Sequence, residues 1–139
     1  MACVFCDIVA GAAPASFVHS DEDVVAFLDV RPFTAGHLLV VPRRHAVGLG
    51  DLDADLGVQV WLVAHRLAGS LRRSGLPCDG VNLFLADGVA AFQEVFHVHL
   101  HVIPRFRGDG IQLRAKPKAP PRSELDNVAA AVRAVSAGG

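Results

Sequence analysis

Short apolar runs and turn residues divide the first third of this chain into two predicted strands. Residues 23–30 and 37–42 are rich in β-branched and apolar side chains, which is typical of buried strands. Pro32 and Gly36 lie between them and favour a turn. The sequence therefore predicts an antiparallel hairpin, and Pro42 ends its second strand.

The longest periodic segment predicts an α-helix after this hairpin. Its apolar residues recur at steps of three or four positions, which places them on one helical face: Leu52, Leu56, Val60, Val63, Leu67 and Leu71. Asp51 or Asp53 can cap the N-terminus of this helix, and Gly75 with Pro77 can end it.

The second half of the chain adds two predicted strands, a loop and a last helix. Residues 81–86 predict a strand, and residues 95–103 predict another because polar and apolar positions alternate there. Residues 105–123 lack periodicity and predict a loop, and residues 124–136 predict a closing helix. Hairpin strands around one long helix indicate an α+β fold with an antiparallel sheet.

Length and composition agree with one globular domain over residues 1–139, with a core at about 3–107, because 52% of the residues are hydrophobic. The formal net charge is −1, so we expect no nucleic-acid partner. No apolar run reaches the roughly 18 residues that span a bilayer, and the N-terminus lacks a secretory signal pattern, so we expect a cytoplasmic protein with no membrane partner. Three cysteines, an odd number, argue against a disulfide framework.

The most unusual feature is a run of alternating histidines. Successive side chains on a strand point to opposite faces, so His97, His99 and His101 should share one face. The apolar residues around them should share the other face, against the helix: Phe96, Val98, Leu100 and Val102. Burying three imidazoles costs desolvation and hydrogen-bonding free energy that Val or Thr would not cost, which favours a functional role.

Two kinds of chemistry fit three histidines on one strand. An H-x-H-x-H strand can chelate a catalytic metal ion, which would make the protein a metal-dependent hydrolase. Alternatively, one neutral imidazole attacks phosphorus while its neighbours orient it and bind the anion of the substrate. The residue types alone leave both alternatives open.

Four sequence blocks resemble the histidine triad (HIT) family. Residues 93–104 read QEVFHVHLHVIP and contain the pattern His-φ-His-φ-His-φ-φ, where φ is apolar. Residues 4–11 (VFCDIVAG), 26–32 (AFLDVRP) and 36–42 (GHLLVVP) are similar to the other blocks of the family, in the same order and spacing. The resemblance implies a HIT-like α+β fold with an antiparallel sheet of about five strands, one long helix and a C-terminal helix. It also implies a homodimer with a continuous sheet.

The resemblance implies a hydrolase that acts through a nucleotidyl-histidine intermediate and releases a nucleoside monophosphate. By position, His99 corresponds to the nucleophile, His101 to the residue that contacts the phosphate, and Gln93 to a glutamine near it. His97 and His37 correspond to supporting residues. A protonated His101 would supply charge beside a neutral His99, because adjacent imidazoles resist being charged together.

A nucleotide-binding pocket is also implied by the family. Asp29 corresponds to the carboxylate that holds the ribose hydroxyls. The base-pocket walls correspond to Phe5, Ile8, Phe27 and Val30. The expected ligands are purine nucleotides or their conjugates: nucleoside phosphoramidates, adenylylated conjugates or dinucleoside polyphosphates.

Three positions depart from the family pattern. Glu94 stands where many members have Ser or Thr, and a carboxylate cannot donate a proton to the leaving group unless it is itself protonated. Phe92 stands where a glycine is usual, and Ala86 where an asparagine commonly contacts the nucleotide. These departures keep open a third alternative, a nucleotide-binding module without catalysis.

A metal site is implied by the two N-terminal cysteines. Cys3 and Cys6 form a C-x-x-C pair, and two thiolates need two further ligands for tetrahedral zinc. Some bacterial HIT proteins complete such a site with histidines, and the matching positions here are His45 and His97. Four protein ligands leave no open position, so this zinc would be structural. Two free thiols are the alternative.

Overall fold

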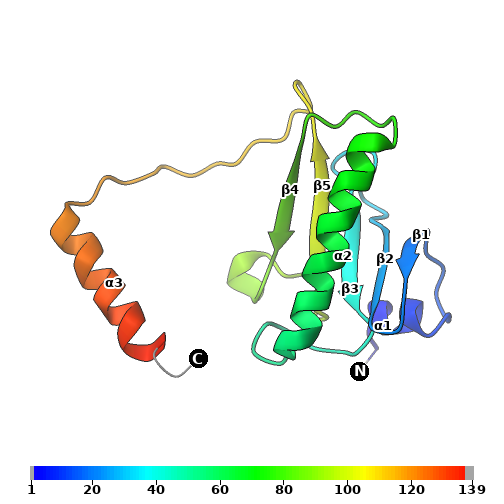
Figure 1. Ribbon diagram of the computed structural model, residues 1–139, viewed down its shortest axis with the longest axis horizontal. Helices are drawn as coiled ribbons and strands as arrows, with labels where there is room; N and C mark the ends of the chain where they lie inside the picture. Colours follow the sequence, from blue (N-terminus) through cyan, green and yellow to red (C-terminus); the bar gives the residue numbers. More distant parts are fainter. Residues whose placement is uncertain (1, 137–139) are drawn as a thin grey trace.

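The computed structural model describes residues 2–136 as a five-stranded antiparallel sheet with helices on both faces (Figure 1). The strand order is β1 (Phe17–Ser20), β2 (Val24–Leu28), β3 (Leu38–Pro42), β5 (Leu100–Arg105) and β4 (Gly80–Leu85). The helices are α1 (Val4–Val9), α2 (Ala54–Arg73), α3 (Arg122–Ser136) and the short 3-10 helix η1 (Val89–Ala91). The α+β class and the five-stranded antiparallel sheet are therefore confirmed.

The long helix α2 covers one face of the sheet. Asp53 caps its N-terminus by accepting a hydrogen bond from the main-chain N–H of Asp55, as the sequence predicted. Its apolar stripe packs on alternate residues of β2, β3 and β5, and the buried members of this core are Val24, Ala26, Leu38, Val40, Val60, Val63, Ala64, Leu67, Leu71, Leu100 and Val102. This core fixes β5, the strand that carries the last histidine of the triad.

The short helix α1 covers the opposite face and forms a second core. Phe5 and Ile8 of α1 pack with the other alternate residues of the hairpin: Val25, Phe27, Leu39 and Val41. Sequence analysis predicted neither α1 nor β1, because segments of six and four residues are too short for a clear periodicity. Because α1 lies on the histidine side of the sheet, it becomes part of the candidate site.

The predicted strand at 95–103 is wrong at its start. β5 begins only at Leu100, and the segment before it is held by a hydrogen bond from the Val98 N–H to the oxygen of Ala46 instead of by a strand ladder. Phe96 is consequently 46% exposed and does not face α2. β5 continues through Pro104, which is tolerated because β3 pairs with β5 only as far as Val102.

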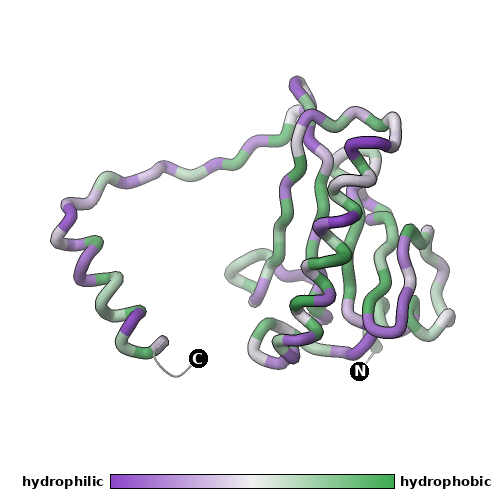
Figure 2. The backbone as a smooth tube through the Cα atoms, viewed as in Figure 1, coloured by the Kyte–Doolittle hydropathy of each residue, from purple (hydrophilic) through white to green (hydrophobic). Residues whose placement is uncertain are grey.

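The predicted C-terminal helix exists, but the expectation that it closes the core is wrong. α3 buries none of its residues, and Figure 1 places it beyond the β4 edge at the end of an extended segment. Figure 2 shows hydrophobic and hydrophilic residues alternating along it. The sheet and α2 form their cores without this helix. Within residues 2–136, no helix has the length and apolar character to cross a membrane.

Candidate functional site

The three histidines lie at the same side of the sheet as α1, at the entry to β5. His97 and His99 are buried, and His101, inside the strand, is half-buried. The ring of Phe5 lies edge-on to His99, with centroids 5.1 Å apart, and His101 lies 4.9 Å beyond His99. The prediction that these imidazoles share one face is consistent with this geometry, although only one of them belongs to a strand.

His99 is oriented by the main chain of its neighbour. Its Nδ1 lies 2.8 Å from the carbonyl oxygen of His97. Because a carbonyl only accepts, this nitrogen carries the proton, and the Nε2 of His99 is left with a free lone pair. Burial lowers the pKa of His99, so its imidazole stays neutral and nucleophilic at neutral pH.

His101 is held in the complementary tautomer through His37. The main-chain N–H of Phe33 donates to Nδ1 of His37 at 3.0 Å, so the proton of His37 lies on its Nε2. This Nε2 lies 2.9 Å from Nδ1 of His101 and donates to it. The proton of His101 therefore lies on its own Nε2, which leaves His101 with an N–H that can donate to a substrate oxygen.

The free protein holds His101 neutral. Burial, together with the neighbouring His99 and His37, lowers the pKa of His101 to about 4. Burial also lowers the pKa of His37. The expectation of a protonated His101 beside His99 therefore differs from the unliganded structure. An anionic phosphate would favour the charged form, since an opposite charge nearby raises an imidazole pKa.

Asp29 connects the hairpin loop to this group of imidazoles. It follows β2, and one of its carboxylate oxygens accepts a hydrogen bond from the N–H of Arg31 at 2.8 Å. Its other oxygen lies 3.6 Å from Nε2 of His37. Phe5 and Phe27 pack edge-to-face nearby, with centroids 5.5 Å apart, whereas Val30 is 91% exposed and belongs to neither core.

Gln93 is fully engaged within the protein. Its Oε1 accepts from the N–H of Gly88, and its Nε2 donates to the main-chain oxygens of Val47 and Val95. In the free protein this buried amide therefore ties together the loops around the histidines, and neither N–H is left for a phosphate.

The three departures from the family pattern lie in different environments. Phe92 is 81% exposed and adopts a left-handed backbone conformation with φ 73°, which a glycine would adopt without steric cost. Glu94 is exposed and forms an ion pair of 3.3 Å with Arg31 across the two loops that flank the site. Ala86 is buried at the end of β4.

Cys3, Cys6, His45 and His97 converge on one point. A tetrahedral zinc with Zn–S of about 2.3 Å and Zn–N of about 2.05 Å requires S···N edges of about 3.5 Å and an N···N edge of about 3.3 Å. Three of the four S···N distances in this group are 3.5, 3.3 and 3.6 Å, and the two Nδ1 atoms lie 3.2 Å apart. The donor set therefore has the size of a zinc tetrahedron.

The protonation states also suit a cation at this cluster. Nε2 of His97 donates to the oxygen of Pro42 at 2.7 Å, so its Nδ1 presents a lone pair to the sulfur atoms. Burial and the nearby Cys3 sulfur raise the pKa of the Cys6 thiol. Burial and the second sulfur are unfavourable for the Cys6 thiolate, and a bound divalent ion would reverse this effect.

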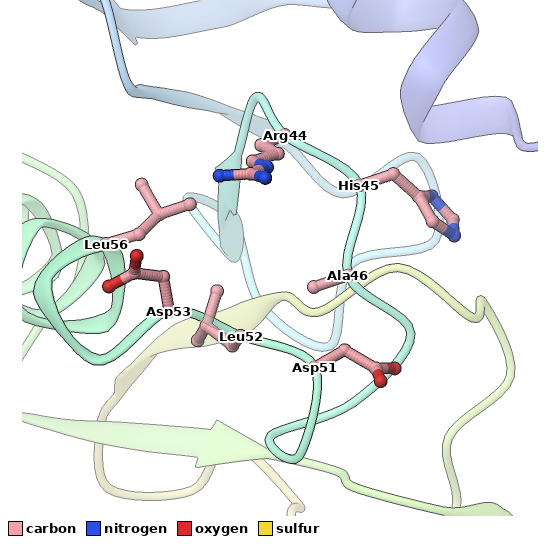
Figure 3. Close-up of a pocket in the computed structure, with 7 residues that line it drawn as sticks. All are labelled: Arg44, His45, Ala46, Asp51, Leu52, Asp53 and Leu56. Carbon is pink, nitrogen blue, oxygen red and sulfur yellow. The ribbon is translucent and has the colours of Figure 1, made fainter.

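A hollow of about 360 Å³ lies on the other side of His45, in front of the N-terminus of α2. Figure 3 shows its lining residues, with the His45 ring directed away from Arg44 and Asp53. No histidine of the triad lines this hollow. The ring of His45 therefore lies with the two cysteines. The hollow is separate from the three histidines of the triad.

Two contacts that build the site had no clear signal in the sequence. Phe5 reaches His99 because α1 packs on the hairpin, and the tautomer of His37 is set by a main-chain N–H in the loop after Pro32. Main-chain donors carry no residue identity, so such a contact is visible only in the structure.

This chain is similar to known proteins both in sequence and in structure. The HIT domain profile matches residues 10–108. An uncharacterised HIT-like protein of Mycobacterium tuberculosis is 45% identical over 123 residues, 84% of this chain and 85% of that protein. The crystal structure of a Zn-bound histidine triad family protein from Mycobacterium smegmatis is 44% identical and covers 100% of this chain and 99% of its own, with a TM-score of 0.78. That of a histidine triad nucleotide-binding protein from Candida albicans is 25% identical and covers 99% of each chain, with a TM-score of 0.88.

Proposed function

Because this chain belongs to the histidine triad family, we propose that it hydrolyses a phosphorus bond on a nucleoside phosphate through an intermediate on His99. The observation that supports this most is the hydrogen bond between Nδ1 of His99 and the oxygen of His97, which leaves Nε2 free to attack. The substrate class is a nucleoside phosphoramidate, an adenylylated conjugate or a dinucleoside polyphosphate, and the product is a nucleoside monophosphate.

The proposed reaction has two displacements at phosphorus. In the first, the Nε2 lone pair of His99 forms a bond to phosphorus, and the leaving group departs with its bonding electrons and takes a proton from water. In the second, water attacks the same phosphorus, the electron pair returns to Nε2, and the water releases a proton. The N–H on Nε2 of His101 donates to a phosphoryl oxygen, where negative charge develops in both steps.

The proposed nucleotide lies between the imidazoles and α1. Asp29 accepts hydrogen bonds from the two ribose hydroxyls, and Phe5, Ile8 and Phe27 provide apolar contacts for the base. Gln93 supports the loops beside the phosphate.

A metal-dependent hydrolase built on the three histidines is less well supported. Among the described residues, the triad is divided between two clusters: His97 groups with the cysteines, and His101 groups with Asp29 and His37. His99 belongs to neither cluster. The three imidazoles therefore do not converge on one ion in this arrangement.

We further propose that Cys3, Cys6, His45 and His97 hold one structural zinc, which supplies a cross-link between the N-terminus and the sheet. The edge lengths of the donor set support this proposal, and so does the Zn-bound mycobacterial relative. Because His97 carries the carbonyl that orients His99, the same cluster would also stabilise the position of the nucleophile.

The proposed assembly is a homodimer through the β4 edge. β4 is a six-residue edge strand with no charged residue or proline, so it lacks the usual protection against pairing. The opposite edge, β1, is shorter and has a register irregularity between Phe17 and His19, which disfavours pairing there. Antiparallel pairing of two β4 strands about a two-fold axis would give the continuous sheet.

The α2 face next to β4 fits the same interface. Arg72 donates to the oxygen of Asp79, just before β4, which shows the side of α2 that faces this edge. Val58 and Trp61 lie close to whole numbers of helical turns from Arg72 and are therefore on that side, with 53% and 52% of their surfaces exposed.

The proposed activity is tested with a panel of purine nucleotide conjugates, by measuring the released monophosphate with mass spectrometry. His99→Ala should abolish turnover and keep nucleotide affinity near that of the wild type. His19→Ala, in β1 and away from the site, is the matched control and should retain full turnover. Turnover of His99→Ala within about tenfold of the wild type would contradict a covalent role, because loss of a nucleophile costs far more than this.

A further inference from the structure

Cys3 and Cys6 are close enough to form a disulfide across the first turn of α1. Cys3 precedes the helix as its N-cap, and the main-chain N–H of Cys6 donates to its Sγ at 3.4 Å. The two Sγ atoms lie within 4.8 Å of each other. Positions three residues apart on a helix have Cα atoms about 5 Å apart, which is within the range of about 4.4–6.8 Å that a disulfide spans. The pair can therefore be oxidised without unfolding α1.

The two sulfur atoms can be reached from solvent, whereas the histidine behind them cannot. Cys3 and Cys6 are both half-buried, and His45, whose Nδ1 lies 3.3 Å from Sγ of Cys6, is exposed. His97, whose Nδ1 lies 3.5 Å from Sγ of Cys3, is fully buried. A small oxidant can therefore reach Cys6 from the His45 side of the cluster without opening either core of the protein.

A hydroperoxide is the class of oxidant that fits this pair. Thiols that ligate a divalent ion are deprotonated, and the thiolate is the nucleophilic form of cysteine. The Cys6 sulfur forms a bond to the hydroxyl oxygen of the peroxide, the O–O bond breaks, and the other oxygen takes a proton and leaves. The Cys3 sulfur then forms a bond to the Cys6 sulfur, the S–O bond breaks, and the hydroxide takes a proton and leaves as water. The two sulfur atoms together lose two electrons, and the peroxide gains them.

Oxidation of this pair would release the ion of the proposed zinc site. Zinc binds the thiolate form of cysteine, and a disulfide sulfur carries no negative charge. The proposed tetrahedron would therefore lose two of its four donors and keep only the imidazoles of His45 and His97. α1 would lose its link to both histidines and keep the apolar contacts that Phe5 and Ile8 make with β2 and β3.

Phe5 connects this change to the proposed nucleotide site. It lies between the two cysteines in the sequence, and its ring is edge-on to His99 and to His97, with centroid distances of 5.1 and 6.0 Å. A less constrained α1 would weaken the contact of Phe5 with a bound base. His97 would keep the hydrogen bond from its Nε2 to Pro42, so its carbonyl would still orient His99. The expected effect is therefore larger on nucleotide affinity than on kcat.

We infer that Cys3 and Cys6 are an oxidation site, at which a hydroperoxide forms a disulfide, releases the proposed zinc and lowers the affinity for nucleotides. This inference rests on the proposed zinc site, and its effect on affinity rests on the proposed nucleotide site. A dithiol should reverse the oxidation, because the half-buried disulfide would be open to thiol–disulfide exchange.

Treatment of the zinc-loaded, full-length protein with hydrogen peroxide tests this inference. A chromogenic chelator should record the release of one zinc per chain beyond that of an untreated sample. Mass spectrometry of an unreduced digest should find Cys3 linked to Cys6, and dithiothreitol with added zinc should restore the starting state. Cys78→Ser is the matched control, because Cys78 packs against the α2 core outside the cluster, and it should release zinc like the wild type. Retained zinc, sulfonic acids without a disulfide, or a disulfide to Cys78 would overturn the inference.

Calorimetry with a nucleoside monophosphate measures the effect on the nucleotide site. The dissociation constant should rise by about tenfold in the disulfide form and return on reduction, because the base loses contact with Phe5. KM should rise with it, whereas kcat should change by less than about threefold. Equal affinities of the two forms would overturn the link between oxidation and nucleotide binding. Reduced protein that binds zinc and nucleotide without turnover would contradict the proposed hydrolysis and not the disulfide. Protein free of zinc before oxidation would contradict the zinc site and, with it, the release.

Discussion

Nδ1 of His99 lies 2.8 Å from the main-chain oxygen of His97, and this one hydrogen bond links the proposed nucleophile to the cysteine cluster. On one side, the imidazole of His97 faces two cysteines and His45. On the other, the bond fixes the His99 tautomer that leaves Nε2 unprotonated. The position of the proposed nucleophile therefore depends on a residue whose own ring belongs to the proposed zinc site.

The half-buried, neutral state of His101 predicts acid sensitivity of the fold. Its pKa is about 4 in the folded protein, whereas a histidine of an unfolded chain titrates near 6.5. Between these values the unfolded chain binds more protons, so the free energy of unfolding should fall as pH decreases from about 6.5 to about 4. Urea unfolding across this range should give a shallower pH dependence for His101→Gln than for the wild type. Equal slopes would show that His101 is not the origin of this pH dependence. The proposed zinc ligands are the same in both proteins, so they do not cause a difference between the slopes.

The ribose contact of Asp29 predicts a ligand-specific loss of affinity. Asp29→Asn keeps an acceptor for the N–H of Arg31 but loses the charge that favours a vicinal diol. The dissociation constant of a ribonucleotide should rise by about tenfold, because a charge-assisted hydrogen bond contributes roughly 1.5–3 kcal/mol. A 2′,3′-dideoxy nucleotide should hardly respond. Calorimetry with both ligands measures this, and equal losses would show that Asp29 acts elsewhere.

Removal of the cysteine ligands should affect stability more than chemistry. Cys3→Ser with Cys6→Ser should leave the zinc content near zero and lower the melting temperature, since a metal that binds only the folded chain stabilises it. Turnover should fall less than in His99→Ala. Cys78→Ser removes the one cysteine outside the cluster and should keep the zinc. Wild-type protein purified without chelators and free of zinc would contradict this proposal.

The left-handed backbone of Phe92 predicts a stabilising substitution. Phe92→Gly should raise the free energy of unfolding by about 0.5–1 kcal/mol, because the steric cost of φ 73° exceeds the entropy cost of glycine. Little burial is lost, since the side chain is mostly exposed. Ala91→Gly, at the preceding residue in η1, should instead destabilise the protein. Urea unfolding compares the two, and a loss of stability in Phe92→Gly would show that its ring makes needed contacts.

The spacing of apolar residues predicted the elements that are long enough for this spacing to recur several times. The stripe from Leu56 to Leu71 and the β2–β3 hairpin are present because their patterns extend over several turns or pleats. α1 and β1 were missed because six and four residues show no reliable period. The start of β5 was placed too early, since the histidine alternation continues into a segment that Ala46 holds.

The candidate site was predictable in its residue types but not in its connections. The cysteine spacing and the four matching family blocks indicated which side chains to consider. The structure adds the partners: Pro42 for His97, His37 for His101, and three main-chain groups for Gln93. These contacts depend on loops meeting in space, which a pattern along the chain does not encode.

The most direct test of the account is to trap the nucleotidyl intermediate on His99. The protein is mixed with a substrate from the active panel, quenched within the first turnover at alkaline pH, digested and analysed by mass spectrometry. We expect one nucleoside monophosphate group, acid-labile, on the peptide that contains His99, and none in His99→Ala. Rapid substrate turnover without such an adduct, or an adduct on another residue, would contradict the central claim.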